Sequence, residues 1–327
     1  MGKTLFLSLL ILFTGVSCKK AGQESIARNV EQIEVPVFNA DSAYQYTAEQ
    51  LAFGPRVPNT PAHKACGNYL AEQMRRFGAE VTEQETTLYL QDKTPIEIKN
   101  IIASFRPDAK QRILLFAHWD TRPYADEDPN PANWRTPIDG ANDGAASCAI
   151  LMEIARQIGI NPPSLGIDII FFDAEDWGPT AFPDEKKHYG NWCMGSEYWS
   201  KNPHIPNYTA RYGILLDMAS APGATFYKEF YSRQSAPSLL KKVWETALTL
   251  GYGSYFIDQD QGAIEDDHVH VIRNRKIPCI DIIHLDPSTK TGFGWYWHTL
   301  EDNLNNVSKE TMQASGQTVL TVIYNEK

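Results

Sequence analysis

Short apolar runs alternate with helical segments along most of this 327-residue chain. Residues 113–117 are a continuous apolar run, which is typical of a strand buried on both faces. Residues 167–172, which are apolar except for Asp168, are also expected to form a buried strand. Between them, residues 145–158 have the apolar period of a helix and are followed by Gly159. Strands that alternate with helices predict the α/β class, with a mixed, mostly parallel twisted central sheet flanked by helices.

The remaining expected elements follow the same pattern. Expected strands cover 81–90, 98–105, 214–216 and 280–285, and the first two are expected to pair. Expected helices cover 61–77, 195–200, 237–250 and 309–324. Because no internal repeat or linker interrupts the chain after about residue 40, we expect one globular domain over 41–327.

The first forty residues are expected to lie outside that domain. Lys3 precedes an apolar run, 5–16, that is too short to span a bilayer, so residues 1–17 are predicted to be a signal peptide. Cys18 follows at the cleavage point and is predicted to carry a lipid, as in bacterial lipoproteins; a plainly secreted chain is the alternative. Residues 18–40 would form a polar tether. The domain is then expected in the periplasm or at the cell surface, with a membrane contact only through the lipid anchor.

Charge and cysteine content narrow the classes of function. The chain has 30 basic and 40 acidic residues, a formal net charge of −10, which argues against nucleic acid as a partner. Apart from Cys18, the cysteines are Cys66, Cys148, Cys193 and Cys279. Their spacing supports neither a zinc ribbon nor a thiol nucleophile, and leaves two disulfides and four buried thiols equally open.

Histidine and carboxylate side chains stand at or near the ends of the expected strands. These residues are His118, Glu175, Asp176, Asp217 and His284. In parallel sheets, functional groups collect in the crevice beyond the carboxyl ends of the strands, so we expect them to share one site. A further histidine, His298, follows an aromatic tail segment over 293–297 and precedes Thr-x-x-Asp-Asn.

A metal centre explains this set of side chains. Catalytic zinc takes histidine nitrogen and carboxylate oxygen and leaves one coordination position open. Asp143, Asp176 and His298 would supply three protein ligands. Glu175 stands beside Asp176 on an expected turn, so one carboxylate can bind metal while the other moves protons.

These motifs resemble a known family. The order His118-x-Asp120, Asn142-Asp143-Gly144, Phe-Phe-Asp-x-Glu-Asp, Leu-Leu-Asp and a terminal His-Thr is similar to the zinc-aminopeptidase fold. Within it, Asp266-Asp267-His268 and Trp297-His298-Thr299 resemble the animal-type glutaminyl cyclases, here in a bacterial lipoprotein version. The resemblance runs from about residue 50 to the C-terminus.

The resemblance implies an activity and a role for each site residue. It implies one zinc per chain, held by Asp143, Asp176 and His298, and cyclisation of the N-terminal glutamine of peptides and proteins to pyroglutamate with release of ammonia. Glu175 would be the general base and acid, with Asp217 and Asp266 in an acidic network behind it. The resemblance also implies that Phe293 and Trp297 line the slot for the substrate side chain.

Some assignments stay open. The pocket histidine of the family would fall at Asp281, with His284 as a substitute, and the wall tryptophan would be Trp177 or Trp192. Residues 126–130 are expected to form a solvated acidic loop and not a calcium site.

Two residues and two other functions also remain as alternatives. His118 and Asp120 either complete a second metal site or, as we favour, hold Asp143 and Asp217 in place. The alternative functions are a two-zinc aminopeptidase of the same fold and an inactive surface binding protein.

Overall fold

The computed structural model describes residues 1–2, 34–90, 92–180, 182 and 190–327. The predicted lipidation site Cys18 lies outside these residues, as do residues 3–33 of the predicted signal peptide and tether. The folded domain begins before the predicted boundary at residue 41, because Phe38 is only 2% exposed and packs in the core. Asn39 then caps α1 (Ala40–Leu51) by accepting a hydrogen bond from the Ser42 amide.

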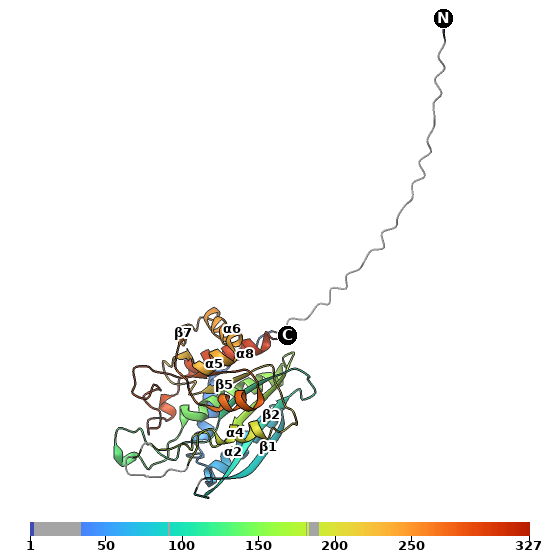
Figure 1. Ribbon diagram of the computed structural model, residues 1–327. Coiled ribbons are helices and arrows are strands. Elements are labelled where there is room, and N and C mark those ends of the chain that lie inside the picture. The colour runs from blue at the N-terminus through green and yellow to red at the C-terminus, as the bar shows by residue number, and fades with distance from the viewer. Residues whose placement is uncertain (3–33, 91, 181, 183–189) are drawn as a thin grey trace. The chain divides into compact units, whose positions relative to one another are not determined.

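A central sheet of mixed direction organises the described domain (Figure 1). In spatial order its strands are β1 (Glu80–Tyr89), β2 (Pro95–Phe105), β4 (Gly166–Phe172), β3 (Arg112–His118), β5 (Gly213–Asp217) and β8 (Cys279–Ile283). The pairs β1–β2 and β2–β4 are antiparallel, whereas β4–β3, β3–β5 and β5–β8 are parallel. The predicted mixed, mostly parallel sheet is therefore confirmed.

Side chains on the central strands alternate between two buried layers. On β3, Ile113 and Leu115 pack in one core cluster, while Leu114 and Phe116 pack in another. The first layer is covered by α3 (Ser147–Ile160) and α8 (Lys309–Tyr324), which contribute to the same cluster. On the second layer lies Trp199 of α4 (Met194–Lys201). Because both faces are covered, residues 113–117 of β3 are a continuous apolar run, and β4 carries one charged side chain, Asp168.

The other elements surround this core. They are α2 (Pro61–Arg76), α5 (Phe230–Ser235), α6 (Pro237–Thr249), α7 (Asp267–His270), and a small sheet of β6 (Phe226–Lys228) and β7 (Phe256–Asp260). Figure 1 shows α6 beside α8, which it contacts. The expected helices at 61–77, 237–250 and 309–324 are confirmed, but α1, α5, α7, β6 and β7 were not predicted. In the described part of the chain, no helix is long and apolar enough to cross a membrane.

The cysteine question is decided in favour of buried thiols. Within the described residues, Cys66, Cys148, Cys193 and Cys279 are all free and buried. The Cys148 thiol donates to the His118 carbonyl, and the Cys193 thiol donates to Glu175. The packing of the domain therefore does not depend on disulfides among these four residues.

Candidate active site

The ends of the parallel strands meet at one edge of the sheet, where a cavity of about 250 Å³ opens. β3 ends at His118 and β5 at Asp217, and the residues after β4 include Glu175 and Asp176. The cavity is lined by side chains from the segment after β4, from the ends of β5 and β8 and from the C-terminal tail, whereas His118 lies outside its lining. Its lining includes Asp143, Glu175, Asp176, Trp192, Asp217, Asp266, Ile283, Phe293, Trp297 and His298.

Asp143 lies on an irregular turn, Ala141–Ala146, that precedes α3. The helix α3 begins two residues after its predicted start, and within the preceding turn Asp143 (φ −90°, ψ 80°) and Gly144 (φ 121°) leave the helical conformation. A side chain at Gly144 would clash, since its Cβ would lie 2.7 Å from the His118 carbonyl oxygen. Asp302 accepts hydrogen bonds from the amides of Asn142 and Asp143, at 2.8 and 3.1 Å. The turn is thus fixed from both sides.

Glu175 and Asp176 are presented by a strained bend after β4. Asp120 accepts hydrogen bonds from both of their amides, at 3.0 and 3.1 Å. Ala174 has φ 50° and Cys193 has φ 56°, in the left-handed region that ordinary residues avoid. The Cys193 amide donates to the Glu175 carbonyl, and its thiol lies 3.1 Å from Glu175 Oε1. Such strain persists only where the surroundings impose it, often at functional sites.

His298 brings the tail into contact with these carboxylates. Its Nε2 lies 3.1 Å from Asp176 Oδ1 and 3.7 Å from Asp143 Oδ2, and its ring stacks on Trp297 at 3.6 Å. Asp143 Oδ2 and both oxygens of Asp176 are buried without a well-directed hydrogen bond from the described residues. Buried polar atoms normally have a partner, so these converging donors fit a cation. Two carboxylates and one imidazole are donor types that zinc accepts.

Burial changes the acid–base properties of the carboxyl groups around the cavity. Burial raises the pKa of Glu175 well above its ordinary value, and the negative charge of Asp266 raises it further. Burial likewise raises the pKa of Asp217 to about 6 and, together with Asp217, that of Asp266 to about 7. Carboxyl groups that titrate near neutrality are suited to accept and return a proton during a reaction.

Comparison with known proteins agrees with this geometry. Residues 100–323 match the family model of peptidase family M28. The chain belongs to peptidase family M28.

Within the family, the solved structures that are similar to this chain include two of high identity. The Tannerella forsythia glutaminyl cyclase is 55% identical, with a TM-score of 0.86 over 89% of this chain and 100% of that one. A Zn-dependent exopeptidase from Parabacteroides distasonis is 58% identical, with a TM-score of 0.87 over 90% and 100%. The bovine glutaminyl-peptide cyclotransferase is 28% identical over 290 residues, covering 79% of this chain and 74% of its own. The resemblance to glutaminyl cyclases of the zinc-aminopeptidase fold is confirmed.

Two residues predicted to line the substrate slot of the M28 site do not do so. Trp177 packs beside Ile98 on the cluster that includes Met194, whereas Trp192 lines the cavity. His284 does not line the cavity either; its Nδ1 lies 2.9 Å from the Tyr296 hydroxyl. Successive side chains of an extended strand point to opposite faces, so the cavity-lining Ile283 turns its neighbour His284 away.

The position at which the family has its pocket histidine was left open between Asp281 and His284. The carboxyl group of Asp281 is fully buried and lies within one cluster with Asp266 and His268. Of the two candidates for the pocket-histidine position, Asp281 therefore lies nearer the acidic network behind the cavity.

His118 and Asp120 lie behind the metal-ligand group. His118 Nε2 is 3.0 Å from Asp143 Oδ1 and 3.3 Å from Asp217 Oδ1. His118 Nδ1 is 3.4 Å from Asp120, which in turn binds the Glu175 and Asp176 amides. His118, Asp143 and Asp217 also form a second group whose atoms are close enough to hold a metal.

Sequence reasoning missed several residues that contact the M28 site. The interpretation of 126–130 as a solvated loop was wrong, because Asp126 and Asp128 are buried. Asp126 pairs with Arg122, and Asp128 accepts a hydrogen bond from the Leu300 amide. Asp302, the acid in the Thr-x-x-Asp-Asn pattern after His298, was visible in the sequence but received no role.

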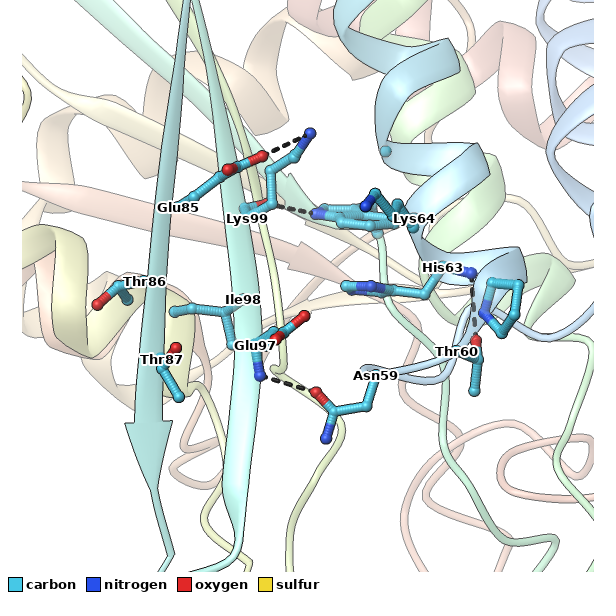
Figure 2. A pocket seen from close by; sticks show the side chains of 13 residues that line it. Asn59, Thr60, His63, Lys64, Glu85, Thr86, Thr87, Glu97, Ile98 and Lys99 are labelled. Carbon is cyan, nitrogen blue, oxygen red and sulfur yellow. Dashed lines mark hydrogen bonds and ion pairs between the residues drawn. The ribbon is translucent and has the colours of Figure 1, made fainter.

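A larger cavity of about 640 Å³ lies between α2 and strands β1 and β2, away from these carboxylates (Figure 2). Two basic side chains on its walls are held in ion pairs. His63 Nε2 is 2.8 Å from Asp173 Oδ1, and Lys99 Nζ is 2.9 Å from Glu85. The His63 ring stacks on Trp119 at 4.3 Å. The buried carboxylate oxygens that lack a well-directed hydrogen bond, and not cavity size, therefore favour the smaller cavity as the candidate active site.

Proposed function

We propose that this site binds one zinc ion through Asp143, Asp176 and His298 and cyclises N-terminal glutamine to pyroglutamate. The observation that carries the proposal is the position of Glu175, a proton-accepting carboxylate in the same small cavity as the three metal-binding side chains. The names of the bovine and Tannerella forsythia relatives support the reaction. The zinc-dependent exopeptidase neighbour supports the metal.

The cavity suits a glutamine side chain. Its volume of about 250 Å³ is small, and Phe293, Trp297 and Trp192 form aromatic walls. Phe293 and Trp297 lie 4.8 Å apart between ring centroids and close one side together. Flat apolar walls hold an amide side chain in one orientation while the carboxylates at the floor contact its polar end. The substrates would be peptides and proteins with an N-terminal glutamine.

Proton transfer by Glu175 accounts for the chemistry. Zinc, when bound, supplies a Lewis acid for the γ-amide carbonyl. Glu175 takes a proton from the substrate α-amine as the amine nitrogen bonds to the γ-carbonyl carbon. Glu175 then gives that proton to the γ-amide nitrogen, whose bond to carbon breaks, and ammonia leaves. Both reacting groups belong to one residue, so the walls mainly need to orient them.

A single metal ion is favoured by the contacts of His118. Its Nε2 atom lies within 3.3 Å of both Asp143 and Asp217, so His118 can hold these two carboxylates in place. We assign His118 and Asp120 to supporting the ligands. We also propose a location for the protein. Cys18 carries a lipid, and the domain lies in the periplasm or at the cell surface of a bacterium.

Mass spectrometry of a peptide that begins with glutamine tests the reaction. The enzyme is incubated with the peptide with and without a chelator, beside the Glu175→Gln variant and a peptide whose N-terminus is acetylated. We expect the peptide to lose ammonia only with the wild-type enzyme in the absence of the chelator. The acetylated peptide should not react, because it has no free α-amine to act as the nucleophile. Zinc content per chain is measured on the same sample.

Other products would reject the proposal in defined ways. Release of the whole first residue would establish an aminopeptidase, and two zinc ions per chain would agree with it. An unchanged peptide with zinc bound would favour the binding-protein alternative.

A further inference from the structure

Arg122 and Asp126 form a fully enclosed ion pair beside the metal-ligand group. Arg122 is 1% exposed, and its Nε and Nη2 atoms donate to the two Asp126 oxygens at 3.0 and 2.7 Å. A two-point contact of this kind fixes both side chains in orientation as well as distance. A buried pair is weak grounds for stability, because desolvation offsets the attraction. The contacts that Arg122 and Asp126 make with the metal-ligand group therefore say more about the role of this pair than the pair itself does.

Asp126 and its neighbour hold His298 at two points. Asp126 Oδ1 lies 3.4 Å from His298 Nδ1, on the side of the ring opposite the Nε2 atom that faces Asp176. The Glu127 amide donates to the His298 carbonyl at 3.1 Å. His298 has φ 54°, a left-handed conformation that needs such support. A carboxylate on the far nitrogen also fixes the tautomer that leaves Nε2 free for metal.

Arg122 holds the opposite side of the site. Its Nη1 donates to the carbonyls of Asp176 and Gly178 at 3.3 and 2.9 Å, and its Nη2 to that of Pro179 at 2.9 Å. The guanidinium carbon lies 4.7 Å from the ring centroid of Trp192, a cation–π contact. One side chain thus contacts the segment that carries a ligand carboxylate and the indole that lines the cavity.

We propose that Arg122 and Asp126 are positioning residues that lock His298, the segment after Asp176 and the Trp192 wall into one unit. The inference rests on the proposed metal at Asp143, Asp176 and His298. Asp126 sets the direction of the His298 donor, and Arg122 ties that donor to the loop and wall on the other side. Neither residue lines the described cavity, so both act through the side chains they hold.

The Asp126→Asn variant tests the histidine contact. The change keeps the shape but removes the charge, and we expect zinc affinity, measured by competition with a chromophoric chelator, to fall by about 10- to 100-fold. The visible absorption band of the cobalt-substituted protein should also shift, because the His298 ring loses its fixed orientation.

Asp168→Asn is the matched control. Asp168 pairs with Arg112 in the same two-point manner, also buried, but at the start of β3 and β4 and not at their ends. We expect this variant to lose thermal stability while its zinc affinity and cobalt spectrum stay as in the wild type. Equal zinc affinity in Asp126→Asn and wild type would overturn the inference. An equal loss in Asp168→Asn would also overturn it, because the effect would then be general destabilisation.

Arg122→Lys tests the wall contact. Lysine keeps the charge but lacks the planar fork, so the carbonyl contacts and the Trp192 stack are lost together. We expect KM for the glutamine peptide to rise several-fold more than kcat falls. Unchanged KM would remove Arg122 from the proposal, and if the variant does not fold, Asp126→Asn decides alone. A wild-type chain that binds no zinc would instead reject the proposed function itself.

Discussion

Buried charged groups lie at both ends of β3 and β4, but only those at one end have a full set of hydrogen-bond partners. At the start of these strands, Asp168 is fully buried and accepts hydrogen bonds from Arg112 and Ser104 at 2.6 Å and from Tyr208 at 2.7 Å. Arg112 in turn donates to several backbone carbonyls. Both oxygens of Asp168 therefore have partners.

At the far end, the carboxylates are left incomplete. Both oxygens of Asp176 and one of Asp143 are buried without a well-directed hydrogen bond from the described chain. Ala174, Met218 and His298 have φ between 48° and 54°, which costs energy at non-glycine residues. The same strands thus end in a satisfied charge cluster on one side and an unsatisfied one on the other. Only the second cluster has carboxylate oxygens left to bind a cation, which supports its assignment as the candidate active site.

The largest effect should follow removal of a donor at the unsatisfied end. His298→Ala should lose both zinc and activity, because ligand loss leaves two carboxylates that repel each other. Metal analysis after dialysis and the glutamine-peptide assay check this. A metallated and active variant would show that the comparison of the two ends does not locate the metal.

Glu175→Gln should separate metal binding from catalysis. Turnover should fall by about 10²- to 10⁴-fold, the usual contribution of a general base, while zinc stays bound. Steady-state kinetics and metal analysis on one preparation give both values. Loss of zinc in this variant would mean that Glu175 is a ligand and not the proton carrier.

At the satisfied end, Tyr208→Phe should affect stability alone. The change removes one hydrogen bond to the Asp168 carboxylate and should lower the free energy of unfolding by about 1.5–3 kcal/mol, with kcat unchanged. Denaturant unfolding measures the first quantity. A change in kcat of the folded variant would show that the Asp168 cluster influences catalysis and is not purely structural.

The smallest effect concerns pH. Burial lowers the pKa of His298, but the adjacent Asp176 and Asp126 outweigh burial and raise it to about 9. Zinc must displace that proton, so below pH 9 the measured zinc affinity should rise with pH, by up to about tenfold per unit, and level off above it. Affinity that stays constant from neutral pH to pH 9 would contradict a protonated His298 in the metal-free site.

The sequence was most informative where one physical signal dominated. Short, mainly apolar runs predicted β3 and β4, and the polar residues at or after their ends placed His118, Glu175 and Asp176 at one edge of the sheet. Elements with weak patterns were missed. The helix α1 is largely polar, and β6 has only three residues, so neither carries a strong period.

Side-chain direction and long-range pairing could not be read from the sequence. The choice between Trp177 and Trp192 depended on how the chain turns after Asp176, and no local period encodes that turn. The burial of Asp126 was missed because His298, 172 residues further along the chain, becomes its neighbour only after folding, and because its nearby partner Arg122 lies in a segment that is neither helix nor strand. Acidic residues in a row usually indicate solvent exposure, and here tertiary contacts override that tendency.

The four buried thiols of the described domain are expected to react little with oxidants or disulfides in their surroundings. Burial raises the pKa of Cys66 to about 12, and burial raises those of Cys148, Cys193 and Cys279 as well. Thiols that do not ionise near neutral pH neither exchange with disulfides nor oxidise readily. The described fold therefore requires no disulfide among these four residues, and we expect its thiols to stay reduced under mildly oxidising conditions.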